Sequence, residues 1–349
     1  MPDNEDRKER GSNMSDIILT AATVITMDDE RPRAEAIAVS GNRIVAVGSL
    51  AECTSALPSA RVISTGAGAL LPGFVEPHGH PFMSGVITEA PVRSIAPWKA
   101  QSWDDVVAAF HAALAETDPS EPLIFSGFDA LLHEHPAPDA RELDQIFGDR
   151  VAAITDNSGH GIYFGTALMK LHGWDGAPPA DPVGGHYQRN TDGSLNGRGF
   201  EVPVLTEVLA PLIAGMGNPL RSAALFFSAM ARAGYTSASD MSYDRQLKPA
   251  YEALAAAPSC PLRVSLWEMS TTETYTESEE FTVDEDMLRK TGVKLWTDGA
   301  VWVGTGATSF PYVDSDATRR AAIDPTTAGG TRSLNYSRQQ LDVILDKAE

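Results

Sequence analysis

The chain has 349 residues, and its 27 Lys and Arg against 47 Asp and Glu give a formal net charge of −20. This length is enough for about two domains, or for one large barrel with an appendage. The acidic balance argues against nucleic-acid binding, which needs clustered cations. No apolar run approaches the ~20 residues that a membrane-spanning helix needs, so no membrane partner is expected.

The cysteines and the N-terminal residues predict a cytoplasmic protein. Cys53 and Cys260 are the two cysteines, and they lie too far apart in the sequence to suggest a disulfide framework. Residues 1–15 are nearly all polar and lack the apolar segment of a secretory signal. We expect them to form a disordered tail.

Residues 16–68 have the pattern of a small β domain. Two runs of β-forming residues, 36–40 and 43–47, flank Gly41-Asn42, which is a signal for a two-residue hairpin turn. Shorter apolar runs at 17–19, 23–26 and 61–63 would add further strands. The segment therefore predicts a short sheet placed before the main domain.

Residues 69–349 alternate apolar runs with helical patterns. The runs typical of strands are 123–128, 151–155, 235–239, 262–267 and 293–296, and helix-like segments cover 103–114 and 220–233. This alternation favours a parallel α/β architecture, with a (β/α)8 TIM-like barrel as the leading form. The Gly- and Pro-rich stretch 178–203 predicts loops and short hairpins within an insertion at about 81–230.

His78 and His80 are the sharpest chemical signal. They follow an apolar run, and residues two apart on a strand project to the same face. Two imidazoles at the C-terminal end of a barrel strand would lie where barrel active sites lie, and imidazole is a common ligand of zinc. The alternative is a structural or surface histidine pair.

Lys294 is the second candidate. Strand alternation would place Lys294, Trp296 and Asp298 on one face of the run that contains them. A lysine among apolar strand residues is costly unless its charge is removed or paired. The alternative is a lysine at a strand edge with its ammonium group in solvent.

Together these segments resemble the amidohydrolase superfamily. Residues 71–80 look like its first barrel strand, residues 234–240 like the second and residues 294–299 like the fourth. The pattern at 36–48 is similar to the leading β-sandwich of the family. Segments 156–160 and 184–193 resemble an insertion in the metal-dependent branch related to N-substituted formamide deformylase. The resemblance covers residues 16–349 and is more specific than any single motif.

The resemblance implies a mechanism and a set of site residues. His78 and His80 would bind a divalent metal, with zinc as the expected metal and one or two ions in the site, and Lys294 would bridge two ions after carboxylation. Lys294 and Asp298 would be catalytic, and His160 and Trp296 would contact the substrate. The implied reaction is hydrolysis of a carbon–nitrogen bond in a small amide or formamide by metal-activated water. A homo-oligomer is compatible with this assignment.

The C-terminal part departs from the family pattern. The family takes further histidines from its fifth and sixth strands and an aspartate from its eighth, but no histidine follows His186. The resemblance therefore predicts a barrel that stops after the fourth strand, with at most half of a metal site. The alternative function is a catalytically inactive fragment with at most a binding role, and a partner chain that supplies the remaining strands is a further option.

Four further histidines are expected to lie outside the metal site, and two of them, His111 and His172, are expected to be structural. His133 and His135 form a second His-x-His, but prolines and acidic residues surround them, which predicts a solvated loop. His111 lies in a helical pattern and His172 beside Gly173-Trp174.

Overall fold

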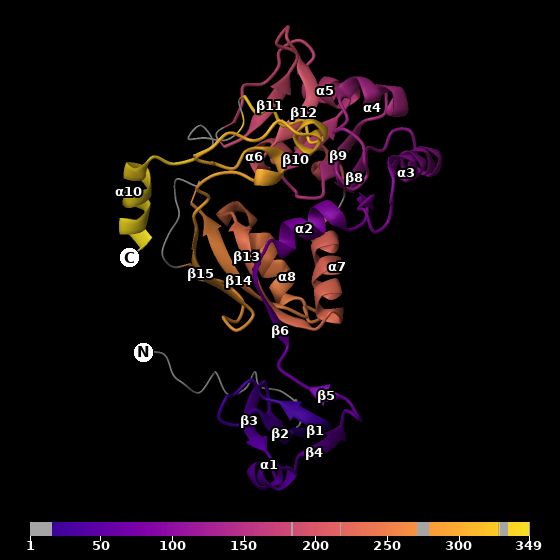
Figure 1. Ribbon diagram of the computed structural model, residues 1–349. Helices are drawn as coiled ribbons and strands as arrows, with labels where there is room; N and C mark the ends of the chain where they lie inside the picture. Colours follow the sequence, from indigo (N-terminus) through magenta and orange to yellow (C-terminus); the bar gives the residue numbers. More distant parts are fainter. Residues whose placement is uncertain are drawn as a thin grey trace. The chain divides into compact units, whose positions relative to one another are not determined.

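The computed structural model describes residues 16–182, 184–216, 218–270, 279–326, 328 and 334–348 (Figure 1). The predicted disordered tail, residues 1–15, lies outside the described residues. The chain divides into two compact units, Met1–Phe74 and Val75–Glu349. None of the described helices is long and apolar enough to cross a membrane.

The first unit contains one five-stranded sheet. Its strands are β1 (Ile17–Ile25), β2 (Arg33–Ser40), β3 (Arg43–Gly48), β4 (Arg61–Ser64) and β5 (Ala69–Leu70), with helix α1 (Leu50–Ala56) after β3. The order is β3-β2-β1-β4, and β5 also pairs with β1. Gly41 has φ +58°, which L side chains rarely adopt, and it forms the expected hairpin turn between β2 and β3. A sandwich needs a second sheet, and the described residues of this unit supply one sheet, so the sandwich is not confirmed.

The second unit contains a six-stranded sheet in the region of the predicted insertion. Its order is β11-β12-β10-β9-β8-β7. The strands are β7 (Arg93–Ser94), β8 (Leu123–Phe128), β9 (Ala152–Asp156), β10 (Gly161–Phe164), β11 (His186–Arg189) and β12 (Leu195–Phe200). The helices of this region are α3 (Trp103–Glu116), α4 (Ala140–Phe147), α5 (Thr166–His172) and α6 (Val202–Gly215). Every residue of β8, β9 and β10 is buried, in agreement with the many apolar residues of these strands.

The same unit contains a four-stranded sheet of order β15-β14-β13-β6. Its strands are β6 (Phe74–Gly79), β13 (Tyr235–Tyr243), β14 (Arg263–Met269) and β15 (Leu288–Lys294), and β13, β14 and β15 are parallel. Helices α2 (Pro81–Thr88), α7 (Pro219–Arg232) and α8 (Lys248–Ala256) lie between these strands in the sequence. The alternation of strands and helices is as predicted, but among the described residues the sheet is open rather than a closed barrel.

Shorter elements follow β15. They are η2 (Val301–Val303), α9 (Asp316–Arg320) and α10 (Arg338–Ala348), and a 3-10 turn, η1 (Arg245–Leu247), precedes α8. Two sequence expectations need correction here. The strand around Lys294 ends at that residue, so Trp296 and Asp298 lie in the following loop and not on a strand face. His133 is not solvated: it is 2% exposed. Its two ring nitrogens pair with the backbone of Asp129 and Ala100, so the buried imidazole has its hydrogen-bond partners within the chain.

Gly85 allows α2 to approach α7 closely. A Cβ atom at this position would lie 2.6 Å from the Cα atom of Ala223 and 2.8 Å from the carbonyl oxygen of Ser222. These are backbone atoms, which cannot rotate away as a side chain would. Because α2 begins directly after His80, this helix contact fixes the backbone that carries the histidine pair.

We expect Gly85→Ala to lower the free energy of unfolding by about 1–3 kcal/mol, because the added methyl group must push the two helices apart. Chemical denaturation of the purified variant would measure this change. Gly215→Ala is the matched control, since Gly215 is also helical and a Cβ there meets nothing within 4 Å. Its stability should stay level or rise by up to about 1 kcal/mol. Equal effects of the two substitutions would contradict the role given to the α2–α7 contact.

Candidate metal centre

The histidine pair lies where β6 ends and α2 begins. His78 is on β6, and His80 is the residue before Pro81, the first residue of α2. Proline at the first helical position needs no amide partner, so the strand passes into the helix within a few residues. The two imidazole rings lie edge to face, with ring centres 6.3 Å apart. His78 is exposed, whereas His80 is partly buried.

Lys294 reaches this pair from the end of β15. Its Nζ atom lies 3.4 Å from Nε2 of His78 and 5.6 Å from the centre of the Trp296 ring. The residues that the sequence placed in one site are therefore neighbours, although 216 positions separate His78 from Lys294.

Burial governs the charge state of this cluster. It lowers the pKa of His80, against the opposing effect of the Asp240 carboxylate, and the nearby Lys294 lowers it further. Burial also lowers the pKa of Lys294. Both groups are thus shifted towards their neutral forms, and a neutral imidazole is the form that binds metal.

His80 carries an unsatisfied atom. Its Nδ1 is buried and has no hydrogen-bond partner among the described residues. Buried polar atoms normally have partners, and one without a partner calls for an explanation such as an ion or a water molecule. An unpartnered imidazole nitrogen, on a ring whose centre lies 6.3 Å from that of His78, fits the start of a metal site. The described residues contain no cluster of three or more His, Cys, Asp or Glu side chains suited to hold an ion, so they supply only part of a ligand set.

Trp296 joins the histidine pair to His160. Its ring lies nearly parallel to that of His80, with centres 6.2 Å apart, and meets the ring of His160 edge to face at 5.9 Å. Trp296 is therefore placed between the candidate metal ligands and the histidine expected to contact substrate, although it lies beyond the strand.

His160 forms a charged pair with Glu201. Its Nδ1 lies 2.7 Å from Oε2 of Glu201, whose side chain is 6% exposed. The other carboxylate oxygen of Glu201 accepts hydrogen bonds from Ala300 N at 3.1 Å and from the hydroxyl of Thr305. Glu201 has φ +75° and ψ 155°, a backbone region costly for a residue with a side chain. Strain of this kind persists where the surroundings hold the residue firmly, as the three partners of this carboxylate do.

Sequence reasoning missed Glu201 and also Asp240. Asp240 is fully buried; its Oδ2 accepts hydrogen bonds from Phe82 N at 3.1 Å and from the Tyr251 hydroxyl at 2.8 Å. It thereby ties the first turn of α2, next to His80, to the end of β13. An acidic residue within a predicted strand was the available signal for Asp240. No local signal links Glu201 to His160.

Asp298 is held within its own loop. Its Oδ2 accepts a hydrogen bond from Ala307 N at 2.8 Å, and its Oδ1 lies 3.4 Å from the Thr297 hydroxyl. No contact between Asp298 and the histidine pair is present among the described residues. A cavity of about 580 Å³ is bordered in part by Gly299, Thr305 and Glu201.

The pair of His160 and Glu201 should make stability depend on pH. Burial lowers the pKa of His160, but its hydrogen bond to Glu201 and the charge of that residue outweigh this and raise it above its ordinary value. A raised histidine pKa adds stability that is complete below about pH 6.5 and is lost as pH rises through the folded-state pKa. Burial raises the pKa of Glu201, but the contact with His160 outweighs this and lowers it, so its contribution is lost in acid.

We therefore expect the melting temperature to fall more steeply as pH rises above about 6.5 in the unchanged protein than in His160→Gln. Thermal unfolding followed by circular dichroism at several pH values would measure the two slopes. His111→Gln is the control, because His111 is an exposed residue of α3. Parallel slopes for the protein and for His160→Gln would show that the ion pair does not contribute.

Comparisons with known proteins identify the family of the chain. The model of the amidohydrolase family matches residues 61–348. The N-substituted formamide deformylase of Arthrobacter pascens is 27% identical over 188 residues, which are 53% of this chain and 34% of that enzyme. The exoenzymes regulatory protein AepA of Pectobacterium carotovorum subsp. carotovorum is 24% identical over 183 residues, which are 51% of this chain and 39% of that protein. The matches thus span little more than a third of these curated relatives.

Two solved structures share the fold. An uncharacterized metal-dependent hydrolase from Pyrococcus horikoshii has a TM-score of 0.64 at 18% identity, with 96% of this chain and 63% of that chain covered. Its counterpart from Pyrococcus furiosus has a TM-score of 0.61 at 17% identity, with coverages of 95% and 64%. The family match extends over most of the sequence, from β4 to α10. The chain therefore belongs to the amidohydrolase family, as the sequence resemblance predicted.

Proposed function

We propose that the protein is a metal-dependent hydrolase that cleaves the carbon–nitrogen bond of a small amide or formamide. His78 and His80 would hold a divalent metal, with zinc as the first candidate, and Lys294 would complete this side of the site. The observation that carries the proposal is the grouping of His80, which has a buried Nδ1 without a partner among the described residues, with His78 and its contact to Lys294.

The two lysines of β15 differ in a way that supports a special role for Lys294. Lys290 is 1% exposed and forms an ion pair of 2.5 Å with Glu268, so its charge is compensated. Lys294 is also partly buried, but it forms no ion pair among the described residues. Its lowered pKa favours the neutral amine. A neutral amine can add to carbon dioxide, forming an N–C bond and releasing one proton, and the product is an anionic carbamate suited to hold metal.

The remaining residues would act on the substrate. A divalent metal, when bound, would polarise the scissile carbonyl group and lower the pKa of a water molecule. His160, whose pKa is raised by its hydrogen bond to Glu201, would donate a hydrogen bond to the substrate and would be able to deliver a proton to the departing nitrogen. Trp296 would form the wall between His160 and His80, and Asp298 is proposed as a second acid–base group.

The formamide substrate class is suggested by the name of one relative, N-substituted formamide deformylase, of which the match spans 34%.

A second function is favoured by one observation: the described residues supply no set of three or more histidine, cysteine or acidic ligands. A protein with such a partial site could bind a metal or a small amide without turnover.

An assay with a panel of N-substituted formamides, acetamides and matched esters separates these functions. We expect equal amounts of formate and amine from the formamides when zinc, cobalt or manganese is added, and no product after treatment with a chelator. Binding of metal with no hydrolysis of any amide would instead support the binding role.

A further inference from the structure

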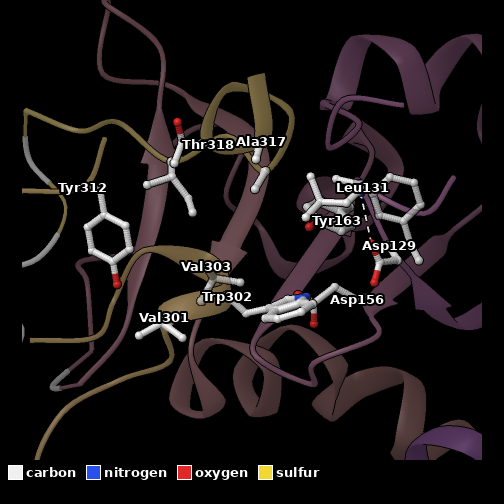
Figure 2. Close-up of a pocket in the computed structure, with 14 residues that line it drawn as sticks. Asp129, Leu131, Asp156, Tyr163, Val301, Trp302, Val303, Tyr312, Ala317 and Thr318 are labelled. Atoms are coloured by element: carbon white, nitrogen blue, oxygen red, sulfur yellow. Dashed lines mark hydrogen bonds between the residues drawn. The ribbon is translucent and has the colours of Figure 1, made fainter. Parts of the chain in front are cut away.

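A further cavity, which contains two carboxylates, is lined by residues other than the histidine pair. It has a volume of about 180 Å³ and is enclosed by the ends of β8 and β9, by β10, and by residues 301–303 and 312–323 (Figure 2). Two carboxylates, Asp129 and Asp156, form part of its wall. Neither makes an ion pair with a lysine or arginine among the described residues.

Asp129 has an unused oxygen at this cavity. The residue is 3% exposed, and its Oδ1 accepts hydrogen bonds from Leu131 N and Leu132 N, both at 3.0 Å. Its Oδ2 has no partner among the described residues. Figure 2 shows the carboxylate between the turn that carries Leu131 and the side chain of Asp156. A buried carboxylate oxygen without a donor is unfavourable, so this atom is prepared for a donor from outside the chain.

The nearest histidine does not supply that donor. Nδ1 of His133 accepts a hydrogen bond from Asp129 N, and its Nε2 pairs with the carbonyl oxygen of Ala100. An imidazole that accepts at one nitrogen and donates at the other is neutral. His133 therefore fixes the backbone of Asp129 and leaves the negative charge of its side chain uncompensated.

Asp156 is 7% exposed and held in place by the adjoining turn. Its Oδ1 accepts hydrogen bonds from the backbone amides of His160 and Gly161, at 3.1 and 3.0 Å. Asp156 therefore connects the wall of this cavity to the backbone of the residue that pairs with Glu201. Burial raises the pKa of Asp156, although these bonds, the bonds from the Ser158 hydroxyl and the charge of His160 oppose the shift.

The rest of the wall is apolar and aromatic. It includes Trp302, Tyr312, Val301 and Ile323. Carbon-rich walls do not suit a divalent metal, which needs about six oxygen ligands. They suit the hydrocarbon part of an organic cation, and aromatic faces attract such cations.

We propose that this cavity binds an organic ammonium group carried by a small apolar molecule, with Asp129 accepting the hydrogen bond of the ammonium. The binding claim stands on the cavity alone. As a claim about substrate it rests on the proposed hydrolase function, and it then specifies amides that carry a separate protonated amine.

Calorimetric titration with benzylammonium at neutral pH tests the site, with benzyl alcohol as the neutral match of similar shape. We expect benzylammonium to bind at least about tenfold more tightly than the alcohol, and Asp129→Asn to weaken its binding by about 10- to 100-fold, the range for a hydrogen bond to a charged group. Asp149→Asn, at an exposed position, is the matched control and should bind as the unchanged protein does.

A second variant tests the same cavity without changing Asp129, so the test does not depend on the folding of Asp129→Asn. Trp302 is 54% exposed, so Trp302→Leu should fold normally and weaken benzylammonium binding by about two- to tenfold. Binding should persist in the His78→Ala, His80→Ala double variant, which separates this site from the metal centre. Equal affinity for the amine and the alcohol, unchanged binding in Asp129→Asn, or no binding of either probe would overturn the proposal.

Discussion

Replacing both His78 and His80 by alanine should abolish metal binding and with it any amide hydrolysis. The structure places the two rings together at the end of β6, and one of their nitrogens is buried without a partner. A catalytic metal lowers the activation barrier by several kcal/mol, so its loss should reduce the rate of hydrolysis by about 10³-fold or more. Elemental analysis of the dialysed protein and the formamide assay would measure the two losses.

The control for this pair is His111→Ala, which removes an exposed histidine of α3. It should keep the metal content and the rate of the unchanged protein. Circular dichroism should show that the double variant is folded, since His78 is exposed and neither histidine belongs to an apolar core cluster. Retention of stoichiometric metal by the folded double variant would contradict the assignment of these ligands.

Changing Lys294 to methionine should produce the second large effect. Methionine keeps much of the apolar length of the side chain but cannot form a carbamate, so hydrolysis should fall by about 10²-fold or more. Lys170→Met is the control, because Lys170 is an exposed residue in the last turn of α5.

Carbon dioxide gives a test specific to the proposed carbamate. Protein prepared without carbon dioxide should have low activity and should recover it when bicarbonate and metal are added together. Lys294→Met should not respond to bicarbonate. If the unchanged protein has the same activity and metal content with and without bicarbonate, Lys294 acts as an ordinary amine.

Local sequence was sufficient to predict the strands on which, or next to which, the candidate site residues lie. The run before His78 predicted β6, and the runs before Asp156 and Asp240 predicted β9 and β13, because short runs rich in β-forming residues are typical of strands. The proximity of Lys294 to His78 followed from the family resemblance, since 216 positions separate the two residues.

Contacts between distant segments could not be predicted in the same way. Glu201 is 41 positions from His160, and Asp240 is 158 positions from Phe82, so neither pairing has a spacing that can be recognised. The end of β15 at Lys294 was also missed. Alternation alone extended the strand to Asp298, whereas that side chain instead accepts a hydrogen bond from Ala307 N within its own loop.

A crystal of the protein grown with zinc, measured at the zinc absorption edge, tests the central claim most directly. The account predicts an anomalous-difference peak within bonding distance of one nitrogen of His78 and one of His80, about 2.1 Å from each, with Lys294 beside it. A peak elsewhere, or fully ordered imidazoles with no zinc between them, would contradict it.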